Sequence, residues 1–305
     1  MKADLPDQLR LLALIERHGT LTAAADELGV TAAAVTQRLA RAEIDWDVTL
    51  VTRTTRGATL TPAGAVLAPF GETVDRQCAA AVEAYAAYRG ETAGRLRIGT
   101  FQAAALHLLP PALTALRHQH ADADLSVADI PSDRAVDAVA SGELDVAVFA
   151  TFDTPPTPRP GVTIRELLVD PMVVVLPDDH RLARSGSRAL RLEQLRDETW
   201  VVIRAGNAAR DQLERAAAQV GFTPHVRFES ESFDVVQALV ATGIGVALVS
   251  RLALTSPPGT TARPLHSPRL SRTIHTAVPA GRTASGLTDH FLRLLTDVAR
   301  DVDGP

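Results

Sequence analysis

The stretch that decides the fold is residues 18–39, HGTLTAAADELGVTAAAVTQRL. Gly19 and Gly29 can each end a helix in the left-handed conformation. The threonines that can cap the following helices are Thr20 or Thr22 for the first and Thr31 for the second. Two short helices joined by a turn at Gly29 form the skeleton of a helix-turn-helix, and small alanine side chains would let the helices approach closely.

The second of these helices has one face suited to reading DNA bases. Val35 and Leu39 point inward at helical spacing, which leaves hydrogen-bond donors and small residues on the other side. Arg38 can donate twice to a guanine edge and Gln37 can pair with adenine, although a phosphate contact is equally open to Arg38. The candidate DNA-binding residues of this helix are Thr31, Ala32, Ala33, Thr36, Gln37 and Arg38.

Residues 50–60 predict a β-hairpin, because β-branched runs flank an Arg56-Gly57 turn. Such a hairpin would form a wing beside the DNA-reading helix. Arg53 and Arg56 on this wing suit phosphate or minor-groove contacts better than base reading. The same two arginines lie in a segment without acidic residues, although the chain as a whole has a net charge of −5.

Thr61-Pro62 predicts the start of a long helix that continues to about residue 89. Its apolar stripe advances by steps of four and three residues, which is the pattern of a heptad seam. The stripe could pack on the protein itself, but self-association is favoured because no compact domain adjoins it. The stripe consists of Phe70, Val74, Gln77, Ala81, Ala84 and Tyr88.

Beyond residues 90–94, which predict a hinge, strands alternate with helices in an α/β architecture, with one helix expected over 103–119. The proline-rich segment 155–160 predicts a crossing between two lobes, with a return near 264–268. The expected division is a winged helix-turn-helix over 1–61, a linker and dimerisation helix over 62–89, and a two-lobed domain over 90–305. Lobe I would span about 95–160 and 268–305, and lobe II about 161–267.

Composition and motifs narrow the classes of function. A single cysteine, Cys78, excludes an intramolecular disulfide and a cysteine-rich zinc site. We expect neither a metal nor a cofactor, and no nucleophile, base and orienting group occur together, so an enzyme is not expected. The start of the chain lacks the pattern of a signal peptide, and no stretch is long and apolar enough for a membrane helix. A cytoplasmic protein without membrane contact is therefore expected.

The amino-terminal motif strongly resembles the winged helix-turn-helix of LysR-type transcriptional regulators, a bacterial family, and the resemblance extends over the full chain. Its residues are 18–25, 28–31, 34–39, Glu43, Leu50, Arg53 and 60–64, with further matches at 141–147 and 240–248. Two departures lie in the turn into the wing. Asp47 stands where the family usually has glycine, and Val51 where it usually has phenylalanine. The resemblance implies a two-lobed sensor domain similar to periplasmic binding proteins, with a small-molecule effector between the lobes.

Ligands of open α/β sheets bind beyond the carboxyl ends of the strands. The candidate effector-binding residues at such ends are Thr100, Gln102, Ser132, Thr151, Arg204, Asn207, Ser230 and Ser232. Ser132, Asn207 and Ser232 could instead only cap the helices that follow. Hydroxyls and backbone amides at helix starts suit a small anion, which favours a carboxylate effector.

The sequence therefore predicts a ligand-responsive transcription regulator that binds double-stranded promoter DNA and works as a homodimer or a homotetramer built as a dimer of dimers. RNA polymerase is a further candidate partner. The alternative is a cytoplasmic solute-binding protein without DNA activity, because the sensor lobes resemble that fold.

Overall fold

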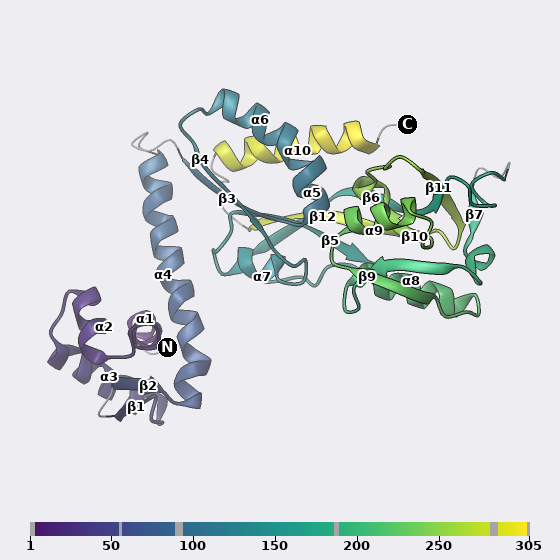
Figure 1. Ribbon diagram of the computed structural model, residues 1–305. Coiled ribbons are helices and arrows are strands. Elements are labelled where there is room, and N and C mark those ends of the chain that lie inside the picture. The colour runs from purple at the N-terminus through teal and green to yellow at the C-terminus, as the bar shows by residue number, and fades with distance from the viewer. Residues whose placement is uncertain (1–3, 55–56, 89–93, 186–188, 281–285, 304–305) are drawn as a thin grey trace. The chain divides into compact units, whose positions relative to one another are not determined.

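Figure 1 shows the computed structural model of the chain, in which residues 4–54, 57–88, 94–185, 189–280 and 286–303 are described. The chain divides into two compact units. Unit 1 comprises residues 1–92 with 141–143, and unit 2 comprises residues 93–140 with 144–305. Among the described residues, none of the helices combines the length and apolar character that a bilayer crossing needs.

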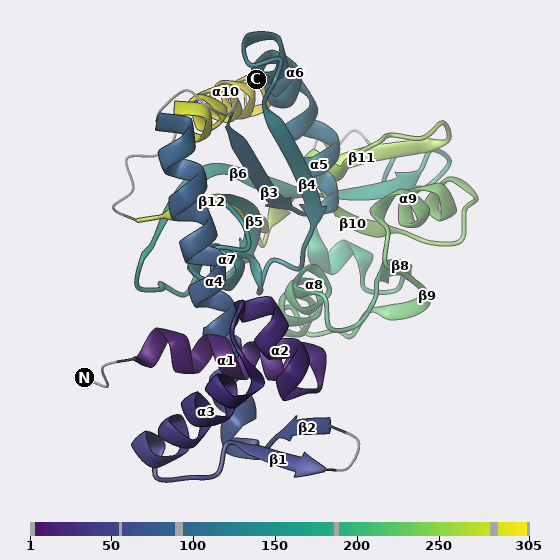
Figure 2. The ribbon, with the colours of Figure 1, turned by 90° about the vertical axis from the view of Figure 1, so that its left-hand side faces the viewer.

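Unit 1 contains a helix-turn-helix, a β-hairpin and one long helix (Figure 2). Its elements are α1 (Leu5–His18), α2 (Leu21–Leu28), α3 (Ala32–Trp46), β1 (Val51–Thr54), β2 (Gly57–Leu60) and α4 (Pro62–Tyr88). Thr20 is the cap of α2, since its Oγ1 accepts the Ala23 N–H at 3.1 Å. Thr31 caps α3 in the same way, accepting the Ala34 N–H at 3.2 Å. The helix starts predicted from the threonines are therefore confirmed.

The hairpin is held against the turn between α1 and α2. Gly19 ends α1 in the left-handed conformation, with φ at 68°. Its carbonyl oxygen accepts the Ala58 N–H at 2.7 Å, and a Cβ on Gly57 would lie only 2.3 Å from that same oxygen. The wing therefore needs a residue without a side chain at this point.

Helix α4 approaches its neighbours in unit 1 equally closely. A Cβ on Gly71 would lie 2.0 Å from the carbonyl oxygen of Leu9, and one on Gly64 would lie 2.3 Å from that of Leu50. These contacts bring the α4 backbone against α1 and against the start of the hairpin. The apolar core beneath them includes Ile15, which is fully buried.

The two departures from the family pattern are accommodated at the end of α3. Asp47 ends the helix with φ at 55°, a left-handed conformation that aspartate adopts more readily than most residues. The Glu43 carboxylate accepts the N–H groups of Leu50 at 2.9 Å and Val51 at 3.3 Å, and Val51 is buried. Glu43 thus fixes the chain between α3 and the wing.

Unit 2 contains two lobes. Lobe I is a sheet in the order β4-β3-β5-β12-β6, with α6 and α10 side by side over one face and α7 on the other (Figure 1). Strand β3 runs parallel to β4 and β5, and β12 runs antiparallel to β5 and β6. The elements of lobe I are β3 (Arg95–Thr100), α5 (Gln102–His107), α6 (Leu109–Gln119), β4 (Asp124–Asp129), α7 (Ala135–Ala140), β5 (Val146–Phe152), the first part of β6 (Val162–Pro177), β12 (Ser271–Pro279) and α10 (Gly286–Asp303).

Lobe II is built around the second part of β6. Strands β10 and β11 pair antiparallel with it, and the parallel pair β8 and β9 adjoins through a bridge between Trp200 and Val246. Its other elements are β7 (Leu190–Arg191), η1 (Leu192–Leu195), β8 (Thr199–Ile203), α8 (Ala208–Gln219), β9 (His225–Ser230), α9 (Phe233–Ala241), β10 (Ala247–Ser250), η2 (Arg251–Ala253) and β11 (Thr260–Ser267).

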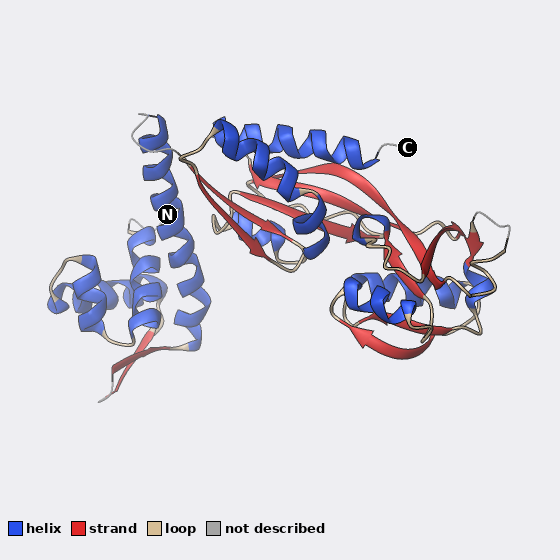
Figure 3. Ribbon diagram, turned by 45° about the horizontal axis from the view of Figure 1, so that its top comes forward, coloured by secondary structure: helices blue, strands red, loops and turns tan. Residues whose placement is uncertain are grey.

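The predicted crossing between the lobes at 155–160 is wrong. Residues 162–171 of β6 pair with β12 in lobe I, and residues 172–177 pair with β10 and β11 in lobe II. The chain therefore crosses inside one continuous strand, which Figure 3 shows running from one lobe into the other. The prolines at 155–160 form only a surface loop, since a strand that changes partners needs no break in its backbone.

The single helix predicted over 103–119 is also wrong, because α5 ends at His107 and α6 begins at Leu109. The cause is local. Pro110 and Pro111 lack an N–H group, so they fit the first turn of a new helix but not the interior of an existing one.

Candidate DNA-reading face and interlobe edge

The candidate residues of α3 form an exposed face. Thr31, Ala32, Ala33, Gln37 and Arg38 are exposed, and Thr36 is half-buried. Val35 and Leu39 lie on the opposite side, fully buried in the core of unit 1. The structure thus places all six residues outside the core. Several of these side chains are small, which would let α3 approach the major groove of DNA closely.

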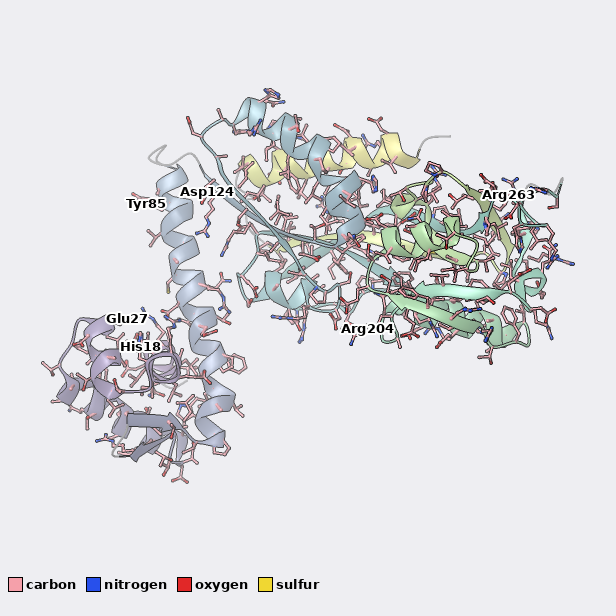
Figure 4. All side chains as sticks on the ribbon, viewed as in Figure 1. His18, Glu27, Tyr85, Asp124, Arg204 and Arg263 are labelled. Atoms are coloured by element: carbon pink, nitrogen blue, oxygen red, sulfur yellow. The ribbon has the colours of Figure 1, made fainter. Side chains whose placement is uncertain are left out.

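Two acidic side chains of the helix-turn-helix are engaged in ion pairs with basic side chains other than Arg38. Glu27 pairs with Arg17 at 3.3 Å and with His18, as Figure 4 shows, and Asp45 pairs with Arg41 at 3.2 Å. Within the described part of the chain, Arg38 forms no hydrogen bond or ion pair. Its guanidinium therefore keeps all its donors for a ligand.

The wing contributes one described candidate. Arg53 lies on β1, exposed, opposite Ala58 of β2 in the hairpin register. Arg56, the other predicted wing residue, lies outside the described residues. The hairpin itself is present where the sequence predicts it.

In unit 2, strand direction brings several chain segments to one edge of the lobe I sheet. The carboxyl ends of the parallel strands β3, β4 and β5 lie there, and antiparallel β12 begins there. We call this the interlobe edge, defined by residues 100–102, 130–132, 151–153 and 271–272. It holds four of the eight predicted effector residues, namely Thr100, Gln102, Ser132 and Thr151.

Most of the polar groups on the interlobe edge have partners within the protein. Thr151 Oγ1 lies 2.9 Å from Nε2 of His275, and Ser132 Oγ accepts the Ala150 N–H at 3.1 Å. Ser132 therefore ties the loop after β4 to β5, and its side chain is not the cap predicted as an alternative. Thr100 is 1% exposed, so a ligand can reach its hydroxyl only after neighbouring groups move.

The predicted residues of lobe II are engaged mainly in local contacts. Asn207 caps α8 through the Ala209 N–H at 3.0 Å, and Ser232 caps α9 through the Asp234 N–H at 3.2 Å. These two residues thus have the capping role that the sequence left open. The other contacts are those of Ser230 Oγ with the Ser232 N–H at 3.1 Å, and of Arg204 with Glu231 (Figure 4).

Two side chains of lobe I, those of Gln102 and Asp153, make polar contacts with lobe II. Gln102 Nε2 lies 3.5 Å from both Ser232 Oγ and Asp234 Oδ2, at the limit of hydrogen bonding. On the other side, Asp153 accepts from Gln212 Nε2 at 2.7 Å and from Arg215 at 2.7 Å. Burial raises the pKa of Asp153, but these donors outweigh it and leave the pKa below its ordinary value.

Sequence reasoning missed an ion pair at the same edge. Arg272 and Asp170 lie opposite each other on β12 and β6, 4% and 2% exposed, with Arg272 Nε 2.8 Å from Asp170 Oδ2. Asp170 Oδ1 accepts the Leu252 N–H at 2.9 Å, and the Arg272 guanidinium lies 4.9 Å from the centre of the Phe101 ring. No periodicity marks these residues, because their place depends on the antiparallel direction of β12.

The imidazole of His275 is the second group that sequence reasoning missed. It stacks on Phe149 with ring centres 5.3 Å apart. Burial lowers the pKa of His275, and the charge of Glu166 opposes this only in part. The neutral imidazole is therefore the form that the fold favours, and it pairs with Thr151. Among the described residues, no cluster of three or more histidine, cysteine or carboxylate side chains could hold a metal ion.

Two family models match the chain. One, described as a bacterial regulatory helix-turn-helix protein of the lysR family, matches residues 6–65. The other, described as a LysR substrate binding domain, matches residues 89–300.

Similar proteins agree with these matches. The transcriptional dual regulator GltC of Bacillus subtilis is 27% identical over 260 residues, 85% of each chain. An uncharacterized HTH-type transcriptional regulator of Mycobacterium bovis is 33% identical over 250 residues, 79% of this chain and 78% of that one. Full-length OxyR from Pseudomonas aeruginosa shares the fold, with a TM-score of 0.66 at 22% identity over 97% of this chain and 94% of that one.

Proposed function

Because this chain belongs to the LysR family of transcriptional regulators, we propose that it reads DNA with the exposed face of α3 and senses an effector at the interlobe edge. It is a DNA-binding transcription regulator with a helix-turn-helix and an effector-binding domain. The observation that carries the proposed reading face is the exposed guanidinium of Arg38, which has no partner among the described residues and lies on the same face as small exposed residues. The match of the helix-turn-helix model disfavours a solute-binding protein without DNA activity.

The α3 proposal is tested by fluorescence anisotropy with the DNA upstream of the chain's own gene. Arg38→Ala should weaken specific binding by about 1–3 kcal/mol, the usual worth of a bidentate contact to a base. Arg17→Ala is the matched control, since Arg17 is also exposed but pairs with Glu27 on α2. Unchanged affinity and sequence preference in Arg38→Ala would remove Arg38 from the reading face.

The proposed role of the wing is distinguished by its dependence on salt. Arg53→Ala should weaken binding to specific and unrelated DNA alike, because a phosphate contact carries no sequence information. It should also lower the slope of log affinity against log salt by about one. Arg56 is proposed to act in the same way.

The effector site is proposed at the ends of the strands in both lobes. Its residues are Thr100, Gln102, Ser132, Thr151, Arg204, Asn207, Ser230 and Ser232. Thr100 and Ser132 support it best, since both lie at the interlobe edge and neither caps a helix through its side chain. A ligand found by a thermal-shift screen should lose affinity in Thr100→Val and Ser132→Ala, while DNA affinity without ligand survives.

We further propose that α4 pairs two chains. Phe70 and Val66 on α4 are 59% and 67% exposed, as are Val82 and Tyr85 further along at 70% and 62%. A dimer would let two α3 helices reach successive major grooves, about 34 Å apart. Light scattering should report a smaller particle when Phe70 and Val74 are both replaced by Asp, because unpaired charge in an apolar seam is costly. An unchanged mass would exclude α4 as the main dimer contact.

The remaining assignments follow from the family. We propose the division 1–61, 62–89 and 90–305, with the boundary inside β6 moved to residues 171–172 as its pairing requires. A dimer of dimers, contact with RNA polymerase, a cytoplasmic location and the absence of catalytic activity are proposed on the same basis. The relatives named above are regulators of transcription.

A further inference from the structure

Arg272 occupies a place that the sequence did not predict. Strand β12 runs antiparallel to β5, so its first residues lie beside the last residues of β5. In this register Arg272 lies opposite Phe152. Phe152 directly follows Thr151, which is one of the candidate effector-binding residues. A buried arginine therefore lies on the interlobe edge itself.

The guanidinium is held by its neighbours but not fully satisfied. Its Nε donates to Asp170, and its plane lies near the Phe101 ring, just after the end of β3. Its Nη2 is buried and has no hydrogen-bond partner. A buried charged donor without a partner destabilises the fold more than a neutral one does. A hydrogen-bond acceptor placed at this nitrogen would therefore be strongly favourable.

Other buried polar atoms also lack partners, but none combines charge with this location. Trp200 Nε1 and His107 Nε2 belong to neutral side chains within the two lobes. Arg263 Nε is charged, but it lies on β11 of lobe II, and both Nη atoms of Arg263 donate to backbone carbonyls (Figure 4). Arg272 is thus set apart by a free Nη nitrogen at the edge where the strands end.

We propose that Arg272 is the anchor for the anionic group of the effector, with Nη2 donating to one oxygen of a carboxylate. This inference rests on the proposed effector site and names the chemistry that the site selects. Nη nitrogens of arginine are well suited to carboxylates, since their donors lie in one plane at fixed spacing.

The surroundings specify the kind of anion. Asp170 already balances one unit of positive charge on Arg272, so the pair is neutral before a ligand arrives. Any anion therefore adds negative charge that the pair does not neutralise, and a doubly charged phosphate would add twice as much beside the buried Asp170 as a carboxylate does. Phe101 and Phe152, both half-buried beside Arg272, offer apolar contact instead. The effector is therefore a small monocarboxylate with an apolar body.

The Gln102 contacts and the Asp153 contacts explain how such a ligand would be enclosed. Both join the lobes through residues of the edge that carries Arg272, so both can hold the lobes together around a bound molecule. Once bound, the carboxylate would supply the acceptor that Nη2 lacks, which favours the closed arrangement of the lobes. Binding should therefore raise the thermal stability of unit 2.

The test uses the full chain and a panel of sodium salts at constant ionic strength: acetate, propionate, butyrate, benzoate and phenylacetate, with chloride, sulfate and phosphate as the other arms. We expect at least one monocarboxylate to raise the melting temperature and bind with a measurable Kd by titration calorimetry. Arg272→Gln should weaken that binding at least tenfold, because it removes a charge-assisted hydrogen bond. Arg263→Gln is the matched control and should bind normally.

A second variant addresses folding. Arg272→Gln leaves Asp170 buried without its partner, so the double variant Asp170→Asn with Arg272→Gln removes both charges together. If either variant is folded and binds the carboxylate as the wild type does, the Arg272 proposal is wrong. It is equally wrong if only sulfate or phosphate binds, or if no carboxylate stabilises the wild-type chain.

The same titrations separate this inference from the proposed function. Loss of binding in Thr100→Val and Ser132→Ala, with normal binding in Arg272→Gln, would keep the effector site and reject its anchor. Loss in Arg272→Gln alone would keep the anchor and reject those two residues. Specific DNA binding by the wild type tests the regulator independently of both.

Discussion

The DNA-reading face of α3 and the interlobe edge of unit 2 differ in whether their polar side chains have hydrogen-bond partners within the protein. On α3, Arg38 is exposed and free of partners among the described residues, while Asp45 of the same helix pairs with Arg41. At the interlobe edge, Thr151, Ser132 and Asp153 all have partners inside the protein. The polar groups of the α3 face can form hydrogen bonds with water until DNA binds. Polar groups buried between two lobes need hydrogen-bond partners within the protein while no ligand is bound.

This difference predicts where each region is vulnerable. Gln37 and Arg38 on the reading face can be replaced with little effect on folding, because their side chains contact solvent. Thr31 is an exception, since its side chain caps α3. The interlobe edge combines ligand contacts with structural ones, so its variants should affect stability and sensing together. Trp46 lies in unit 1 and Trp200 in unit 2, and the sequence has no other tryptophan. Replacing either one with Phe leaves a fluorescent reporter for the other unit.

The largest expected effect is at Asp170. Asp170→Asn removes the charged partner of Arg272 in a pair that is 2% and 4% exposed, and breaking such a pair typically costs about 3–5 kcal/mol. Urea unfolding in the Trp46→Phe background should show this loss through Trp200. In a Trp200→Phe background, Trp46 should show that unit 1 is unaffected. A loss below about 1 kcal/mol would mean that the pair does not support the edge.

The next largest effect is expected on the stability of unit 1, at the contact between α4 and α1. Gly71→Ala would place a Cβ 2.0 Å from the Leu9 carbonyl oxygen, so α4 must move away from α1 at an expected cost of about 1–3 kcal/mol. Trp46 should report the loss in a Trp200→Phe background. Gly286→Ala on α10, read through Trp200 in a Trp46→Phe background, is the control, because no atom lies within 4 Å of its added Cβ. Equal stability of the two variants would show that the close approach at Gly71 is not needed.

The smallest expected effect is the pH dependence of stability that His275 contributes beside the interlobe edge. Because burial lowers the pKa of His275, the unfolded chain binds a proton more readily than the folded one. The stabilising contribution is therefore complete above the unfolded pKa of about 6.5 and is lost as the pH falls from that value through the lower pKa of the folded chain. Urea midpoints at pH 7.5, 6.5 and 5.5 should fall more steeply in the wild type than in His275→Gln, by less than about 1.4 kcal/mol per pH unit. Parallel curves would contradict the role of His275.

Part of the interlobe edge could be predicted from the sequence, because the carboxyl ends of parallel strands lie at the same edge of a sheet in any strand order. Thr100, Ser132 and Thr151 follow strands that the sequence marks by short apolar runs. Arg272 could not be found in this way, since it lies at the start of a strand, and nothing local encodes that β12 runs antiparallel. The exposed face of α3 was easier, because the periodicity of a single helix determines which side chains point outward.

The sequence by itself determined most local events of this chain: a helix begins at Thr31, helices end at Gly19 and Gly29, and Val35 and Leu39 face the core. It left the cap of α2 open between Thr20 and Thr22, and the structure selects Thr20. These follow from hydrogen bonds and dihedral angles within a few residues of each other. Only the tertiary structure decided that β6 continues from one lobe into the other and that Arg272 meets Asp170. Strand partners and directions depend on residues about a hundred positions apart, which no local pattern of side chains can specify.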